Sequence, residues 1–198
     1  FACGAHAPAM ADLDSNGTTE LIFGRSTFTA SLAQLWYGTG GRAWYGRDDY
    51  PYPEGYWNSG YHSVAWDMDG DGTYMEVVAG RTVYNWDGST FCELGWYEGS
   101  TWVEATDGYP AVADLIRFSG DIEGEPEIVL TGNEWVRVFH GVPDYDSNGL
   151  ARCTMVAELP NDPALDTGVS GSLPTHPTCD PYAAAFGGPP NIADFDGD

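Results

Sequence analysis

The feature of the sequence that most constrains its fold is an acidic phrase that occurs four times. In most copies a short apolar run ends in Ala-Asp or Trp-Asp, acidic residues or asparagine follow at alternate positions, and glycine closes a turn. A second apolar run, opened by glutamate, follows the first three copies. A phrase that recurs in the same apolar frame indicates a repeat protein in which each copy is one structural unit. The first aspartates of the four copies are Asp12, Asp67, Asp114 and Asp194.

The spacing of these copies favours a β-propeller. Successive first aspartates lie 55, 47 and 80 residues apart, and periods near 50 are typical of propeller blades rather than of helical solenoids. The 26 glycines and 13 prolines are typical of short strands joined by many turns. We therefore predict an all-β fold built from blades of four antiparallel strands.

The repeats also predict how the chain is divided. We interpret residues 1–198 as a partial propeller, and the segment 141–188, rich in Pro, Gly, Asp and Thr, as a loop inserted within it. About four to eight blades are needed to close a ring. Further blades of a longer chain, or another chain, would therefore complete it. The predicted blades are 8–61, 62–108 and 109–185, and 186–198 is the start of the next one.

The acidic turns are candidate metal sites. Carboxylates at alternate positions of an extended turn point into one concavity, and a hard divalent cation removes their mutual repulsion. Oxygen-only ligands favour calcium over zinc or copper, while magnesium prefers to keep several waters. The predicted ligands are Asp12, Asp14, Asn16, the backbone carbonyl near Thr18 and Glu20 in the first copy, and Asp67, Asp69, Asp71, the carbonyl near Thr73 and Glu76 in the second.

An EF-hand does not fit these loops. Its twelfth position must be glutamate, but the twelfth residue of the first two loops is Phe23 or Val78. The closing glutamate lies eight residues after the first aspartate in the first loop and nine in the second. The last ligand of the second loop is therefore either displaced by one residue or carried on a bulge. The alternative to metal binding is that these are ordinary solvated hairpin turns.

The two later copies are less regular. The third has an insertion after its first aspartate, and the fourth stops at the last residue of the chain, before any closing glutamate. A further acidic turn at 144–149 lies outside the repeat frame, and we interpret it as a plain turn. The candidate ligands are Asp114, Asp121, Glu123 and Glu127 in the third copy, and Asp194, Asp196 and Asp198 in the fourth.

Taken together, these residues resemble the FG-GAP/VCBS repeat family, the calcium-loop β-propellers that include the integrin α-subunit head. The matching features are the Ala-Asp-x-Asp-x-(Asp/Asn)-Gly loops, the Glu that opens an apolar run ending in Gly, and Phe-Gly-Gly-Pro-Pro at 186–190. The resemblance extends over essentially the whole chain. It implies calcium bound in the hairpin between the first two strands of a blade, and it leaves the activity open.

An aromatic segment at 35–62 is a second candidate site. Its side chains could stack on sugars or anchor a protein partner, with an arginine adding hydrogen bonds. The alternative is that they fill the space between blades. The candidate ligand-binding residues are Trp36, Arg42, Trp44, Tyr45 and Trp57.

The four cysteines favour an oxidising compartment. None has CxxC spacing, so a zinc or redox motif is not indicated. We predict a disulfide between Cys153 and Cys179, which flank a connector that has little else to hold it. Four buried free thiols are the alternative.

The net charge of the chain limits which ligands it can bind. With 7 basic and 30 acidic side chains, a net charge of −23 disfavours nucleic acid and anionic membrane surfaces, and no apolar run is long enough to span a bilayer. The four histidines show no paired metal-ligand spacing, so no catalytic residue is assigned. We expect a non-enzymatic extracellular or cell-surface module for adhesion, assembly or recognition of a protein or glycan ligand. The alternatives are carbohydrate binding through 35–62, or a polysaccharide-active enzyme with its active site outside this chain.

Overall fold

The computed structural model describes residues 8–23, 26–37, 62–105, 108–115, 125–132 and 135–159. Within these ranges every regular element is a β-strand, fourteen in all, which confirms the all-β class. The same ranges hold no helix that could cross a bilayer.

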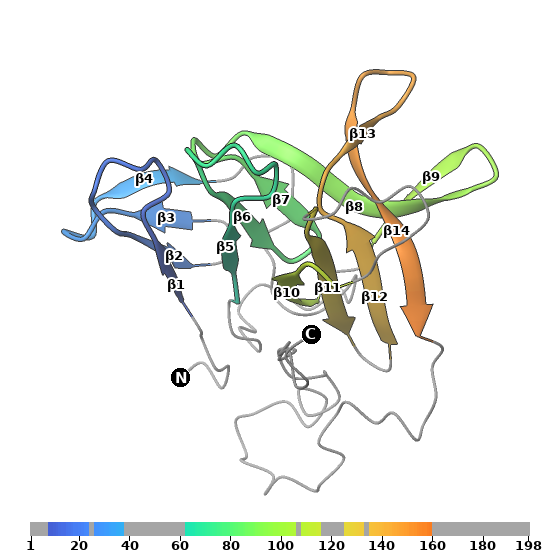
Figure 1. Cartoon of the computed structure of the whole chain (residues 1–198), viewed down its shortest axis with the longest axis horizontal. Coiled ribbons are helices and arrows are strands. Elements are labelled where there is room, and N and C mark those ends of the chain that lie inside the picture. The colour runs from blue at the N-terminus through green and yellow to red at the C-terminus, as the bar shows by residue number, and fades with distance from the viewer. Residues whose placement is uncertain are drawn as a thin grey trace, which may run out of the picture.

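The first unit is a four-stranded antiparallel meander in which strands pair in chain order (Figure 1). Its β1–β2 hairpin encloses the first acidic loop, and Ala11 pairs with Glu20 where the loop begins and ends. The strands are β1 (Ala9–Ala11), β2 (Glu20–Phe23), β3 (Ser26–Phe28) and β4 (Gln34–Tyr37).

The second unit repeats this arrangement. Its four strands again pair antiparallel in chain order, and a further short strand continues from the fourth as a hairpin. The strands are β5 (Val64–Trp66), β6 (Glu76–Ala79), β7 (Thr82–Tyr84), β8 (Thr90–Glu98) and the hairpin strand β9 (Thr101–Glu104).

The third unit has the same four-stranded order, with one extra strand before its last member. That extra strand pairs only with the last strand, and the two form a hairpin. The strands are β10 (Tyr109–Ala113), β11 (Glu127–Gly132), β12 (Trp135–His140), β13 (Asp144–Tyr145) and β14 (Ala151–Leu159).

The second and third units share one sheet, which separate blades would not do. Strands β8 and β14 pair in parallel, with Cys153 opposite Leu94, and this joins the units into a ten-stranded sheet. Each of these strands has nine residues, so each extends past its own meander. The extensions carry the β8–β9 and β13–β14 hairpins, which project toward the right and the top of Figure 1. Three four-stranded meanders are therefore present in the described ranges, but a closed ring is not.

The predicted bridge between Cys153 and Cys179 is wrong, because Cys153 is bonded to Cys92. Their Cα atoms are 5.7 Å apart, and both side chains are fully buried. The parallel pairing of β8 with β14 brings the two cysteines together, although 61 residues separate them in sequence. Cys179 lies outside the described residues.

The predicted loop at 141–188 is also wrong in its first part. Residues 151–159 form β14, the fourth strand of the third unit, and β13 precedes it. The Pro, Gly and Asp content of the whole segment conceals Ala151–Leu159, a nine-residue run that contains none of these three residue types. Residues 160–188 lie outside the described ranges.

Neighbouring units interlock through the apolar residue that follows the first aspartate of the first and second loops. Leu13 is buried with Val77 and Tyr84 of the second unit. Met68 is buried with Phe139 of the third unit, and its methyl group lies over Gly141, where a Cβ would come within 2.4 Å. The first strands β1, β5 and β10 accordingly lie side by side.

Candidate metal centre

Each of the first three acidic loops ends on a glutamate that opens the second strand of its unit. Glu20, Glu76 and Glu127 pair with the residue immediately before the first aspartate of their own loop. The loops differ in length, but the register at their two ends is the same. The extra residue of the second loop is therefore absorbed within the loop, and its closing glutamate is not displaced.

One oxygen of each glutamate is used to hold the loop. Glu20 Oε2 accepts a hydrogen bond from the backbone N–H of Leu13 at 2.9 Å, and Glu76 Oε2 accepts one from Met68 at 2.8 Å. In the third copy, Glu127 Oε2 accepts one from Leu115 at 2.6 Å. The sequence analysis assigned these glutamates only as ligands and missed this anchoring role, although an Asp-Leu or Asp-Met pair precedes each of them and carries the signal.

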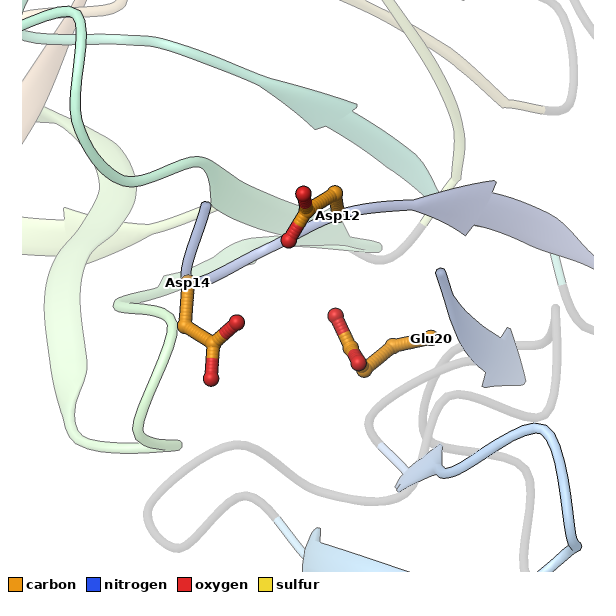
Figure 2. Close-up of side chains that lie close together, drawn as sticks. All are labelled: Asp12, Asp14 and Glu20. Atoms are coloured by element: carbon orange, nitrogen blue, oxygen red, sulfur yellow. The ribbon is translucent and has the colours of Figure 1, made fainter. Parts of the chain in front are cut away.

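The first loop gathers three carboxylates around one space. Figure 2 shows Asp12, Asp14 and Glu20 pointing toward one another, and each offers an oxygen within 4.8 Å of the others. Asp12 is held by the backbone N–H groups of Asn16 at 3.0 Å and Gly17 at 2.8 Å. These hydrogen bonds hold the Asp12 carboxylate within the loop.

The second loop reproduces this geometry. Asp67, Asp69 and Glu76 also offer oxygens within 4.8 Å of one another. Asp67 accepts hydrogen bonds from the N–H groups of Asp71 at 3.1 Å and Gly72 at 2.9 Å, as Asp12 does from the corresponding residues. Two separate sequences therefore fold into the same cage.

Backbone conformation explains why glycine recurs here. Gly17 and Gly72 have φ of 88° and 69°, in the left-handed region that glycine adopts at least cost. Gly70 and its counterpart Ser15 also have positive φ, 68° and 55°. Ser15 adopts this conformation while its hydroxyl donates a hydrogen bond to the Thr73 carbonyl of the other loop.

The remaining predicted ligands of these two loops have other partners. Asn16 Oδ1 accepts hydrogen bonds from the backbone N–H and the hydroxyl of Thr18. Asp71 Oδ1 accepts the N–H groups of Thr73 at 2.6 Å and Tyr74 at 3.0 Å, and Asp71 is not among the three clustered carboxylates. The structure therefore gathers two aspartates and one glutamate in each of these loops.

The charge at the second loop is unfavourable as it stands. Glu76 is 3% exposed. Burial raises the pKa of its carboxyl to about 7, the N–H of Met68 opposes the shift, and the nearby charges of Asp69, Asp67 and Asp71 add to it. A divalent cation would remove this penalty. The oxygen-only donor set fits a hard cation such as calcium.

The first two loops also contact each other directly. The Met75 N–H donates to the Leu13 carbonyl at 3.0 Å, and the Ser15 hydroxyl donates to the Thr73 carbonyl. The predicted ligand carbonyl near Thr73 is therefore used in the contact between loops. The two candidate sites are neighbours at the junction of the first and second units.

The third copy is only partly described. Asp114 directly follows β10, and Glu127 opens β11. The other predicted metal ligands of the third and fourth copies lie outside the described residues, and these are Asp121, Glu123, Asp194, Asp196 and Asp198. Of the aromatic segment, Arg42, Trp44, Tyr45 and Trp57 also lie outside them.

Trp36 occupies a junction, not a free surface. Its indole N–H donates to the Trp86 carbonyl at 2.7 Å, and its ring covers Gly88, where a Cβ would lie 2.7 Å away. It also contacts Tyr84, with ring centroids 5.8 Å apart. These contacts are those expected of the alternative, in which the Trp36 side chain fills space between units, while ligand contact stays a prediction.

The acidic turn at 144–149 is closed by its own hydrogen bonds. Asp146 Oδ1 accepts the N–H groups of Asn148 and Leu150, and Oδ2 is paired with Arg152 at 3.3 Å. These hydrogen bonds, together with Arg152, hold the pKa of Asp146 below its usual value. Its carboxylate caps the β13–β14 hairpin and belongs to neither three-carboxylate cluster.

Replacing Gly70 with alanine is expected to cost about 1 kcal/mol and to lower the melting temperature by about 2–4 °C. A Cβ at Gly70 meets nothing within 4 Å, so the cost comes only from its φ of 68°. Differential scanning calorimetry measures the change, with Ser147→Ala in an exposed turn as the control. A Gly70→Ala protein as stable as the wild type would contradict this loop conformation.

Comparisons with known proteins give one structural match. No family model matches the chain, and no curated protein sequence matches it. Among solved structures, the V. cholerae biofilm matrix protein Bap1 matches with a TM-score of 0.45 and 18% sequence identity. The match covers 75% of this chain and 20% of Bap1, so the chain spans about a fifth of that protein's length.

Proposed function

We propose that this chain is part of an extracellular, calcium-binding β-propeller of the FG-GAP/VCBS type. On this proposal it is a non-enzymatic module for adhesion, assembly or ligand recognition. The observation that carries the proposal is the repeated cage, since Asp12, Asp14 and Glu20 are arranged as Asp67, Asp69 and Glu76 are. Nothing in an ordinary solvated turn favours a cluster of like charges. A cation bound by the three carboxylates of each loop would explain why the cluster occurs twice.

The unit arrangement supports the propeller part of the proposal. Three meanders of four strands follow one another, and their first strands β1, β5 and β10 lie side by side. Blades arranged around an axis bring their first strands together in this way. Leu115, the third member of the Leu13 and Met68 series, is 40% exposed, as expected if a further unit covers it.

The buried disulfide supports the extracellular part. Disulfides persist in oxidising environments and are rare in the cytosol. Cys92–Cys153 joins the second and third units at their shared strand pair. A cross-link of this kind suits a module that has to keep its shape outside the cell.

Calcium titration by isothermal calorimetry tests the proposal. We expect binding at the first two loops, with magnesium binding more weakly because it keeps more of its waters. Asp14→Asn and Asp69→Asn should each remove one site, because each takes away a carboxylate from one cage. Asp144→Asn, an exposed acidic residue outside the loops, is the matched control.

Three outcomes would contradict the proposal. The first is an absence of heat at millimolar calcium. The second is equal affinity for magnesium. The third is a calcium response that Asp144→Asn reduces as much as Asp14→Asn does.

A further inference from the structure

Two exposed aromatic rings stack on each other beside the second acidic loop. Tyr74 follows that loop, and Trp86 lies in the turn between β7 and β8. Their ring centroids are 4.9 Å apart and their planes differ by 16°. Tyr74 is 36% and Trp86 38% exposed, so both residues are open to solvent although their rings contact each other.

The turn that carries Trp86 is held rigidly. Its carbonyl accepts the Trp36 indole N–H at 2.7 Å, which fixes it to the first unit. The Asn85 N–H donates to the Ser89 carbonyl at 2.8 Å, and Asp87 accepts the N–H of Ser89 at 2.9 Å. A rigid aromatic side chain loses little conformational entropy on binding a ligand.

Tyr74 is held from the other side. Its N–H donates to Asp71 Oδ1 at 3.0 Å, and the next residue, Met75, donates its N–H to the Leu13 carbonyl. Met75 and Trp36 both pack against the buried cluster that joins the first two units. The Tyr74–Trp86 pair therefore rests on a core built from both units.

We propose that the Tyr74–Trp86 pair binds a neutral polysaccharide, with a sugar ring stacked on the exposed aromatic face. A sugar ring offers a flat C–H face to an aromatic ring, and its hydroxyls can bond to the Tyr74 phenol. A net charge of −23 disfavours anionic polymers. The inference rests on the proposed recognition role, but it uses side chains other than the metal-binding carboxylates.

The acceptor oxygens of Asp71 and Asp87 are occupied within their own turns. Asp71 Oδ1 already accepts two backbone N–H groups, and Asp87 Oδ1 accepts the N–H and the hydroxyl of Ser89. These oxygens are therefore committed to the loop and turn that carry the two rings. Stacking on the rings is then the main interaction that the pair offers.

Affinity electrophoresis of the calcium-loaded chain tests the inference, with galactomannan, xyloglucan and dextran as neutral probes in separate gels. We expect at least one probe to retard the wild type, and Trp86→Ala and Tyr74→Ala to weaken that affinity at least about tenfold. Trp86→Phe should recover part of the affinity, because it keeps a flat ring. Tyr145→Ala, at a 73% exposed tyrosine on β13, is the matched control and should change nothing.

A melting curve of each variant separates loss of binding from loss of fold. The inference is overturned if no neutral probe retards the wild type, or if a folded Trp86→Ala protein binds as well as the wild type. Salt-sensitive capture of a polyarginine peptide by the same rings, without polysaccharide binding, overturns it in favour of a cationic partner. If calorimetry finds no calcium site while the aromatic variants still lose polysaccharide, the metal proposal fails and this inference stands.

Discussion

Replacing Cys92 and Cys153 together with alanine is expected to lower the free energy of unfolding by about 4 kcal/mol. The bridge spans 61 residues, so it removes a large amount of loop entropy from the unfolded chain. In a chain of 198 residues this loss corresponds to a fall in melting temperature of about 8–16 °C. Urea unfolding followed by tryptophan fluorescence gives the free energy, and scanning calorimetry gives the melting temperature.

A second variant serves as the control for this prediction. Replacing Cys3 and Cys179 with alanine leaves the Cys92–Cys153 bridge in place, and should preserve the stability that this bridge provides. Peptide mapping under non-reducing conditions identifies the bridge directly. A peptide containing Cys153 linked to Cys179, or a Cys92/Cys153 variant as stable as the wild type, would contradict the prediction.

The parts of the molecule that could be predicted from the sequence are local. The acidic loops are short segments in which side-chain spacing, a left-handed glycine and the flanking apolar runs all act within about ten residues. Asp12 and Glu20, or Asp67 and Glu76, are brought together by a hairpin whose strands border the loop directly. The clustered carboxylates and the four-stranded meanders could therefore be predicted, including Asp12 and Glu20 at the two ends of the first loop.

The parts that could not be predicted depend on contacts between distant segments. The parallel pairing of β8 with β14 is set by how two units meet, and the sequence of neither strand indicates it. The partner of Cys153 follows from that pairing, so the cysteine nearer in sequence was the wrong choice. Likewise, the use of Trp36 as a support for Trp86, 50 residues away, cannot be inferred from aromatic composition.

Changing Glu76 to glutamine is expected to shift stability in opposite directions with and without calcium. The glutamine side-chain oxygen can still accept the Met68 N–H, but it removes a buried negative charge that lies near three aspartates. In EDTA the variant should therefore melt at a higher temperature than the wild type. With calcium present it should gain less than the wild type, because one site lacks a charged ligand.

The size of the lost calcium stabilisation follows from the linkage between calcium binding and folding. At a calcium concentration of 100 times the dissociation constant, each site adds about 2.7 kcal/mol to the free energy of unfolding. Loss of one of the two described sites should remove about that amount. Glu20→Gln should do the same at the first loop, whereas Glu104→Gln, in an ion pair with Arg81, should leave the calcium gain intact. A Glu76→Gln protein with the full calcium gain would show that this glutamate only holds its loop, because the Met68 hydrogen bond survives the substitution and the charge does not.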